Sequence, residues 1–228
     1  MARVLLIVGG GIAAYKSLEL VRLFKKAGHS VTPVLTKGGE HFVTAMSLGT
    51  LAESQVHTSL WELKDEVEIG HIQLSRAADF ILVCPATADL LAKMAQGIAD
   101  DLATTLLLAT DKPVVVAPAM NVRMWLHAAT RRNVQQLIDD GIKVIEPAEG
   151  DMACGEHGPG RLPEPQAIVE WLGANGFLPR PCLLPASTSS SPPGPRMSRS
   201  TQCESSLTGR RDGRVLQLPK QQHGSGRG

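Results

Sequence analysis

The chain has 228 residues, 43% of them hydrophobic, and a formal net charge of +1 at pH 7, which is typical of a globular protein. This near-neutral charge gives no reason to expect binding to nucleic acid or to a membrane surface. The apolar start, Val4–Val8, is too short to cross a bilayer and lacks a signal cleavage site, so we expect a cytoplasmic protein. No CxxC spacing occurs among Cys84, Cys154, Cys182 and Cys203, so we expect neither a disulfide framework nor a metal site.

Short apolar runs alternate with helical patterns from the start of the chain. The first strand is predicted at Val4–Val8, followed by glycines and a helix from about residue 14 to residue 27. A second strand is predicted at Ser30–Leu35, and another helix from near Glu40. The apolar face expected for the first helix consists of Leu20, Leu23, Phe24 and Ala27.

The alternation continues to residue 178, and it predicts a doubly wound α/β fold, Rossmann-like or flavodoxin-like, with a parallel sheet. Residues 56–58 are expected to form an edge strand, and the acidic run Glu62–Glu68 a solvated loop. A short helix at His71–Ala78 leads to a strand at Phe80–Cys84. The later elements are predicted at Leu90–Gln96 (helix), Leu102–Ala109 (helix), Val114–Ala117 (strand), Thr130–Asp140 (helix), Lys143–Ile145 (strand), Glu149–Arg161 (glycine-rich loop) and Pro165–Leu172 (helix).

The first strand runs into contiguous glycines, Gly9–Gly11, that precede a helix. Glycines in this place let backbone N–H groups approach a phosphate, and the helix N-terminus adds partial positive charge. The spacing differs from the dinucleotide-binding fingerprint, and Thr36 follows the second strand where an acidic residue would hold an adenosine ribose. These features favour a mononucleotide such as FMN over NAD, and a plain tight turn is the alternative.

A second candidate site follows the strand Val114–Ala117, where the chain continues Pro118-Ala119-Met120-Asn121. Ligands of open parallel sheets bind outside the carboxyl ends of the strands, so the Asn121 carboxamide is well placed to hydrogen-bond a substrate. Two interpretations are open: Asn121 binds substrate, or it caps a helical turn that starts at Val122.

Five short motifs occur in order along the chain: Gly10–Lys16, His71-Ile72, Pro85–Asp89, Pro118–Asn121 with Met124, and Ala153–Arg161. With these motifs, residues 1–178 resemble the flavin-dependent cysteine decarboxylases, most closely the bacterial members that act on phosphopantothenoylcysteine. Any one motif alone would be a weak signal, whereas five in the same order are specific.

The resemblance implies FMN-dependent decarboxylation of 4'-phosphopantothenoylcysteine to 4'-phosphopantetheine in coenzyme A biosynthesis. In that family, FMN oxidises the thiol-bearing carbon to a thioaldehyde, which accepts the electrons left by the departing carboxylate. The reduced flavin then returns hydride to the resulting enethiol while an acid supplies a proton. The resemblance also implies self-association, as a trimer or a dodecamer.

The resemblance assigns roles to individual residues. His71 matches the active-site histidine, Asn121 the residue that binds the substrate carboxylate, and Cys154 the proton donor in a mobile glycine-rich flap. Met120 and Arg161 are further candidates for binding substrate. The residues expected to contact FMN are Gly10, Gly11, Ile12, Ala13, Thr36, Pro85, Ala86 and Thr87.

Other polar and apolar residues near these motifs have simpler interpretations. We expect Cys84, Met124 and Trp125 to pack in the core and Lys16 to be solvated. The pair Asp100-Asp101 precedes a helix and is expected to cap it.

Two other classes of function remain open. One is a related flavoprotein that acts on a peptidyl-cysteine, or a flavin prenyltransferase of similar fold. The other is a non-catalytic, flavin-binding regulatory subunit, against which the joint presence of His71, Asn121 and Cys154 argues.

Residues 179–228 differ in composition from the preceding domain: they are rich in Ser, Pro, Arg, Gln and Gly, and we expect disorder. Bifunctional members of the resembled family instead continue into a synthetase domain. Read in the alternative frame, the codons of 189–196 permit Ile-Ile-Thr-Ala-Gly-Pro-Thr, which looks like the opening of that domain. We therefore expect a frameshift between about residues 177 and 185, a functional tail being the alternative, and the coding DNA tests it.

Overall fold

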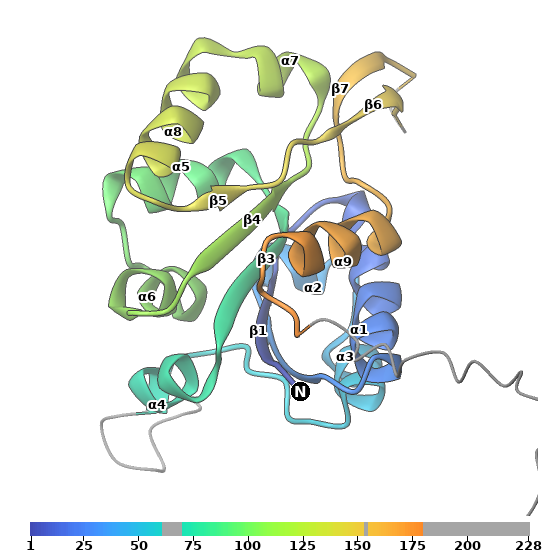
Figure 1. Cartoon of the computed structure of the whole chain (residues 1–228). Helices are drawn as coiled ribbons and strands as arrows, with labels where there is room; N and C mark the ends of the chain where they lie inside the picture. Colours follow the sequence, from blue (N-terminus) through green and yellow to red (C-terminus); the bar gives the residue numbers. More distant parts are fainter. Residues whose placement is uncertain (61–69, 153–154, 180–228) are drawn as a thin grey trace, which may run out of the picture. The chain divides into compact units, whose positions relative to one another are not determined.

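The computed structural model describes residues 1–60, 70–152 and 155–179 (Figure 1). The chain divides into two units, Met1–Cys182 and Leu183–Gly228, and the described residues all belong to the first. In that part, a parallel sheet has the strand order β2-β1-β3-β4-β5, which is the order of flavodoxin-like folds. This order confirms the predicted doubly wound α/β fold. The strands are β1 (Arg3–Val8), β2 (Ser30–Leu35), β3 (Phe80–Ala86), β4 (Val114–Pro118) and β5 (Lys143–Val144).

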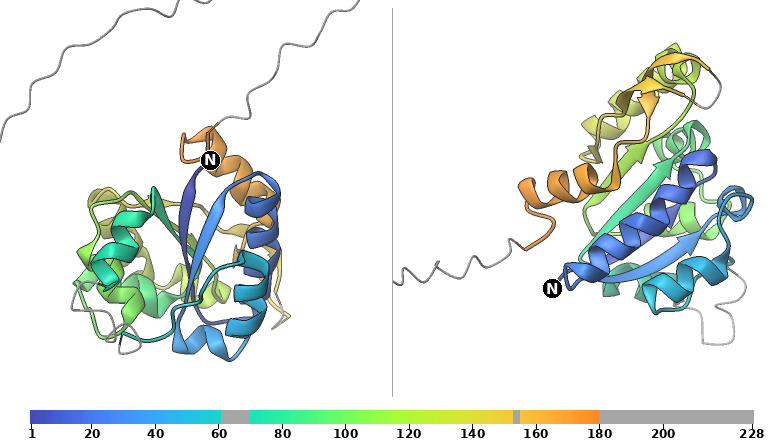
Figure 2. Two further views of the ribbon diagram at one scale, coloured as in Figure 1. Left: turned by 90° about the horizontal axis from the view of Figure 1, so that it is seen from below. Right: turned by 90° about the vertical axis from the view of Figure 1, so that its right-hand side faces the viewer.

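Helices cover both faces of the sheet (Figures 1 and 2). One face packs against α1, α3 and α9, and the other against α4, α5, α6 and α8. A 3₁₀ helix, η1 (Ile12–Tyr15), links the glycine turn to α1. The α-helices are α1 (Lys16–Lys26), α2 (Lys37–Glu40), α3 (Ala45–Ala52), α4 (Gly70–Ala77), α5 (Ala88–Gln96), α6 (Leu102–Ala109), α7 (Val122–Leu126), α8 (Ala128–Asp139) and α9 (Pro165–Ala174).

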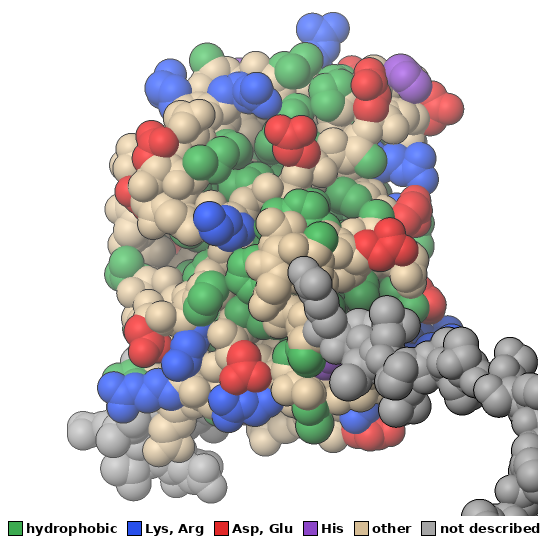
Figure 3. All heavy atoms as spheres, viewed as in Figure 1, with side chains coloured by type: hydrophobic (Ala, Val, Ile, Leu, Met, Phe, Trp, Pro, Cys, Tyr) green, Lys and Arg blue, Asp and Glu red, His purple; other side chains and the backbone are tan. Residues whose placement is uncertain are grey.

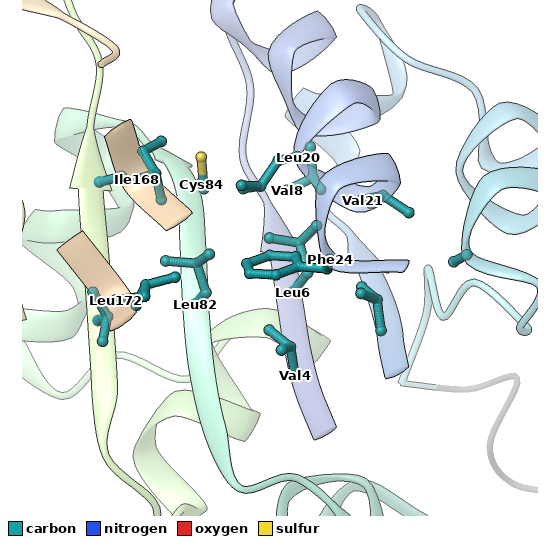
Figure 4. Close-up of a cluster of buried hydrophobic side chains, with 14 of the residues drawn as sticks. Val4, Leu6, Val8, Leu20, Val21, Phe24, Leu82, Cys84, Ile168 and Leu172 are labelled. Carbon is teal, nitrogen blue, oxygen red and sulfur yellow. The ribbon is translucent and has the colours of Figure 1, made fainter. Parts of the chain in front are cut away.

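The core consists of two clusters that the sheet separates. Successive residues of a strand point to opposite faces, so Val4, Leu6 and Val8 pack on the side of α1, against Leu20 and Phe24 (Figure 4). The residues between them belong to the cluster on the other face. Burying one such side chain fully stabilises the folded state by roughly 1.5–3 kcal/mol. The two clusters therefore fix the strands of the sheet, and with them the loops at the strand ends.

The predicted apolar face of the first helix is partly wrong. Leu20 and Phe24 are fully buried as expected, but Leu23 is only partly buried and Ala27 is exposed. The reason is that α1 ends at Lys26, with Ala27 as its C-cap and Gly28 following at a φ of 79°.

The segment after β2 also differs from the prediction. A helix was expected to begin near Glu40, but α2 ends there, and the next helix, α3, begins after the N-cap Thr44. The expected edge strand at 56–58 is reduced to a single bridge between His57 and Val34. The acidic run at 62–68 lies outside the described residues.

The glycine-rich loop expected at Glu149–Arg161 is instead an antiparallel hairpin of β6 (Ala148–Asp151) and β7 (His157–Arg161). Glycine and proline have low strand propensity, so local sequence does not predict β7. A tertiary contact holds it: the Met120 N–H donates to the Gly160 carbonyl at 2.9 Å. A Cβ at Gly160 would lie 2.5 Å from the Met120 carbonyl oxygen, so only glycine permits this approach.

The surface carries charges of both signs. On the face drawn in Figure 3, Lys and Arg side chains are interspersed with Asp and Glu rather than gathered in one patch. Among the described residues, no helix is both long enough and apolar enough to span a membrane.

Candidate active site

A cavity of about 510 Å³ lies at the carboxyl ends of β1 and β4, bounded by the hairpin β6–β7. Its size is in the range of small-molecule sites, and its position agrees with the rule for open parallel sheets. Residues predicted to bind cofactor or substrate meet there. They are Gly10, Gly11, Ile12, Ala13, Met120, Asn121 and Arg161.

The glycine turn brings backbone, not side chains, to the cavity. The Gly9 N–H donates to the Pro85 carbonyl at 3.2 Å, and a Cβ at Gly9 would lie 2.3 Å from that oxygen. Gly11 has a φ of 105°, and a Cβ there would meet nothing within 4 Å. Among the described residues no side chain caps the N-terminus of η1, so the turn fits an anionic group such as the phosphate of a flavin nucleotide.

Thr36 lies beside this turn but serves as the N-cap of α2. Its hydroxyl donates to the Val8 carbonyl at 3.0 Å and accepts from the Gly39 N–H at 3.1 Å. It lines a second cavity of about 280 Å³ near the start of α6. Because the hydroxyl proton is used within the protein, contact between Thr36 and a phosphate stays a prediction.

The end of β3 connects the two loops that bound the main cavity. The Pro85 carbonyl accepts from Gly9, and the Ala86 carbonyl accepts from the Ala119 N–H at 3.0 Å. Thr87 caps α5, accepting from the Leu90 N–H at 3.2 Å. The segment 85–87 thus positions the glycine turn relative to the loop that carries Asn121.

Asn121 is fixed at both ends of its carboxamide. Its Oδ1 accepts from the Arg123 N–H at 2.7 Å, which confirms the capping interpretation for α7. Its Nδ2 donates to the Glu156 carboxylate on the hairpin. Asn121 therefore caps a helix and lines the cavity at once, and the two interpretations are compatible.

Lys16 is buried rather than solvated, which corrects the expectation. Its side chain is 9% exposed, and its Nζ donates to Glu164 Oε1 at 2.9 Å and to the Leu162 carbonyl at 3.2 Å. Arg161 donates to the same Glu164 oxygen at 3.0 Å. Two cations that line the cavity thus share one carboxylate, and Asp151 adds a second negative charge to the lining.

The Glu164 carboxyl predicts a pH dependence of stability. The hydrogen bond from Lys16 lowers its pKa below the ordinary value of 4.5. A carboxyl whose pKa is lowered by folding stabilises the folded state above its ordinary pKa, and this contribution is lost as the pH falls through the lowered pKa. We expect Glu164→Gln to unfold at a lower urea concentration than the parent at pH 7, with the difference shrinking below about pH 4.5. If the urea midpoints of variant and parent differed by the same amount at pH 7 and at pH 3, the prediction would be wrong. The control is Glu170→Gln, the same change at an exposed position of α9.

The remaining predicted residues are placed as follows. His71 lies in the first turn of α4, and Figure 1 shows α4 near the amino end of β1, at the opposite end of the sheet from α7. The His71 side chain and Cys154 are outside the described residues. Cys84 is core as predicted, and burial raises the pKa of its thiol to about 12.

The other expected packing and capping roles are mostly confirmed. Trp125 is buried, but Met124 is 49% exposed, contrary to the expectation. Asp101 caps α6 in a capping box with Thr104, as predicted. Asp100 is paired with Lys93 at 3.0 Å, a hydrogen bond that lowers the Asp100 pKa.

Lys16, Glu156 and Glu164 are the residues of this region that sequence reasoning missed. Lys16 and Glu156 lie within two of the five motifs, but their partners are far away in the sequence. Lys16 and Glu164 are 148 residues apart, and Asn121 and Glu156 are 35 residues apart. A signal was available only for Lys16, as a cation in the first turn after a glycine-rich loop.

Several curated proteins with similar sequences carry the same name. The chain is 45% identical over 179 residues to "Coenzyme A biosynthesis bifunctional protein CoaBC" of Vibrio vulnificus, an alignment that covers 78% of this chain and 44% of the relative. It is 43% identical over 168 residues to the Escherichia coli protein of that name, covering 74% and 41%. The chain thus spans less than half the length of the curated relatives that it matches.

Solved structures of similar fold include a PPC decarboxylase mutant complexed with pantothenoylaminoethenethiol, with 34% identity and a TM-score of 0.71 over 78% of this chain and 99% of that one. Another is the FMN binding protein AtHal3, with 36% identity and a TM-score of 0.68 over 76% and 96%. The family model described as Flavoprotein matches residues 1–175. The chain therefore belongs to the flavoprotein family, and its cofactor is a flavin.

Proposed function

We propose that the chain catalyses FMN-dependent decarboxylation of 4'-phosphopantothenoylcysteine to 4'-phosphopantetheine in coenzyme A biosynthesis. The observation that carries this proposal is the shared cavity, in which the Asn121 carboxamide lies across from a glycine turn that fits a flavin phosphate. Support comes from the CoaBC relatives and from the enethiol bound to the similar decarboxylase mutant. An enethiol is the compound expected after loss of CO₂ and before reduction.

The residues of the turn would hold FMN through their backbone. Gly10, Gly11, Ile12 and Ala13 line the cavity, and a Cβ at Gly10 would lie 3.1 Å from the Gly38 carbonyl, so the two loops pack closely. When bound, FMN supplies a reversible two-electron oxidation of the carbon that bears the thiol. The protein contributes orientation and proton positions.

Three residues carry the chemistry of the chain itself in this proposal. Asn121 donates a hydrogen bond to the substrate carboxylate, and as a neutral donor it orients that group without stabilising its charge as strongly as an arginine would. His71 takes or holds the thiol proton, since imidazole titrates near neutral pH. Cys154 supplies the proton to the enethiol carbon. Met120 and Arg161 contact the rest of the substrate.

Self-association is part of the proposal, as a trimer or a dodecamer. α4, which carries His71, lies near the amino end of β1, whereas Asn121 follows the carboxyl end of β4 (Figure 1). In an assembly of copies, His71 of one copy can reach the cavity of another. The separation of the two residues within one copy supports this arrangement.

The proposed domain organisation is a decarboxylase domain at residues 1–178 followed by a low-complexity segment at 179–228. The family match ends at residue 175, and the CoaBC relatives continue well beyond the matched part.

The experiment uses the full chain loaded with FMN. We expect a yellow protein with flavin absorbance bands that releases CO₂ from phosphopantothenoylcysteine and forms phosphopantetheine. Cys154→Ser is expected to release CO₂ without forming phosphopantetheine. A chain that binds FMN but releases no CO₂ would contradict the proposal, and CO₂ release only from a peptide ending in cysteine would replace its substrate.

A further inference from the structure

The Glu156 carboxylate contacts Asn121. Asn121 is the residue that binds the substrate carboxylate in the proposed function. Glu156 lies on the short connection between β6 and β7 and is partly buried. Its side chain accepts a hydrogen bond from Asn121 Nδ2. A ligand carboxylate that binds Asn121 would meet a donor that already serves a carboxylate of the protein.

The geometry on both sides makes this contact well defined. On the Asn121 side, the bond from the Arg123 N–H to Oδ1, at 2.7 Å, leaves the amide end of the side chain toward Glu156. On the hairpin side, the Glu156 carbonyl accepts from the Met152 N–H at 2.9 Å, which fixes the backbone that carries the carboxylate. The two backbones are tied together by the bond between Met120 and Gly160.

Charge explains what this contact does to binding. A hydrogen bond to an ionised acceptor is roughly twice as strong as one to a neutral acceptor. Asn121 Nδ2 carries two N–H groups, so a ligand carboxylate that binds the second one must approach the charged Glu156 closely or displace it, whereas a ligand without a carboxylate meets no such repulsion. The contact therefore weakens the binding of ligands that carry a carboxylate and leaves the binding of other ligands unchanged. The substrate is held less tightly in the ground state, before its carboxylate leaves as CO₂, than it would be without Glu156.

We propose that Glu156 is an affinity-setting residue: an intramolecular competitor that occupies the Asn121 carboxamide until the substrate carboxylate displaces it, and that returns after CO₂ has left. This inference rests on the proposed function, because it takes Asn121 as the carboxylate-binding residue. It adds a specificity role for a glutamate whose charge the reaction itself does not use.

Two ligands that cannot turn over test the proposal: phosphopantothenoylserine, with a hydroxyl for the thiol, and phosphopantothenoylethanolamine, which also lacks the carboxylate. Calorimetry on the FMN-loaded full chain measures both dissociation constants. We expect Glu156→Gln to bind the serine compound about five- to tenfold more tightly and the ethanolamine compound as the parent does. The matched control is Glu149→Gln, the same change at an exposed position of β6, which should alter neither constant.

Several results would overturn the proposal: equal tightening of both ligands, no tightening of the serine compound, or the same effect from Glu149→Gln. If neither ligand binds any variant, the substrate of the proposed function is wrong, and a second measurement decides on Glu156 alone. In the ligand-free protein, the side-chain amide resonances of Asn121 should shift in Glu156→Gln. Unchanged resonances would show that the contact does not form.

Discussion

Asn121→Asp is expected to lower kcat/KM for phosphopantothenoylcysteine by roughly two to three orders of magnitude, because it replaces a hydrogen-bond donor by a carboxylate that repels both the substrate and Glu156. The helix cap should be retained, since aspartate caps helices as well as asparagine does, and only the repulsion from Glu156 should lower the thermal midpoint. Measuring CO₂ release, flavin content and the thermal midpoint on one sample separates the loss of activity from a loss of structure.

A double variant sharpens this prediction. Adding Glu156→Gln removes the repulsion within the protein but not the repulsion of the substrate, so it should restore stability without restoring activity. Asn121→Ala is the complementary control: it removes the cap on α7 and should destabilise the protein by about 1 kcal/mol in addition to its loss of activity. An Asn121→Asp variant that keeps more than a tenth of the parent activity would argue against binding of the carboxylate by Asn121.

Gly9→Ala is expected to destabilise the fold by about 2–4 kcal/mol, the sum of overpacking and of a weakened hydrogen bond. The added Cβ would lie 2.3 Å from the Pro85 carbonyl oxygen, which is backbone and cannot rotate away. The same carbonyl accepts the Gly9 N–H, so moving the turn aside breaks that bond. Urea unfolding at neutral pH measures the loss.

The control for Gly9→Ala is Gly173→Ala in α9. At Gly173 a Cβ would meet nothing within 4 Å, and alanine favours helix, so this variant should be as stable as the parent or slightly more stable. If both variants unfolded at the same urea concentration, the close packing of the glycine turn on β3 would not be important for stability.

The sheet was predictable because β1, β3 and β4 are nearly continuous apolar runs followed by turn residues. β1 and β3 are buried on both faces, and a strand of a parallel sheet that is buried in this way has a nearly continuous hydrophobic sequence. Helix ends were less predictable, as Ala27 shows: the helical spacing includes it, but Gly28 ends the helix first. Element type followed from periodicity, whereas the boundaries depended on caps and on single glycines.

The hairpin and the ion pairs of the site were not predictable because distant partners create them. Nothing in the local sequence around Gly160 favours a strand, and its pairing with β6 and its contact with the Met120 backbone give it one. Lys16 looks like an ordinary surface residue of an amphipathic helix until Glu164 is brought next to it. The glycine turn and Asn121 were identified because their residue types and their positions at strand ends are local properties.

The loops around the cavity are joined by main-chain hydrogen bonds: Gly9 to Pro85, Ala119 to Ala86, and Met120 to Gly160. Main-chain bonds do not depend on side-chain identity, apart from the glycines that allow the approach. Neighbouring side chains such as Ile12 and Tyr15, both largely exposed at the cavity, can therefore be replaced without moving the loops that these hydrogen bonds join. A flavoprotein built in this way can acquire new ligands by drift or by laboratory selection while the arrangement of its cavity loops is inherited unchanged.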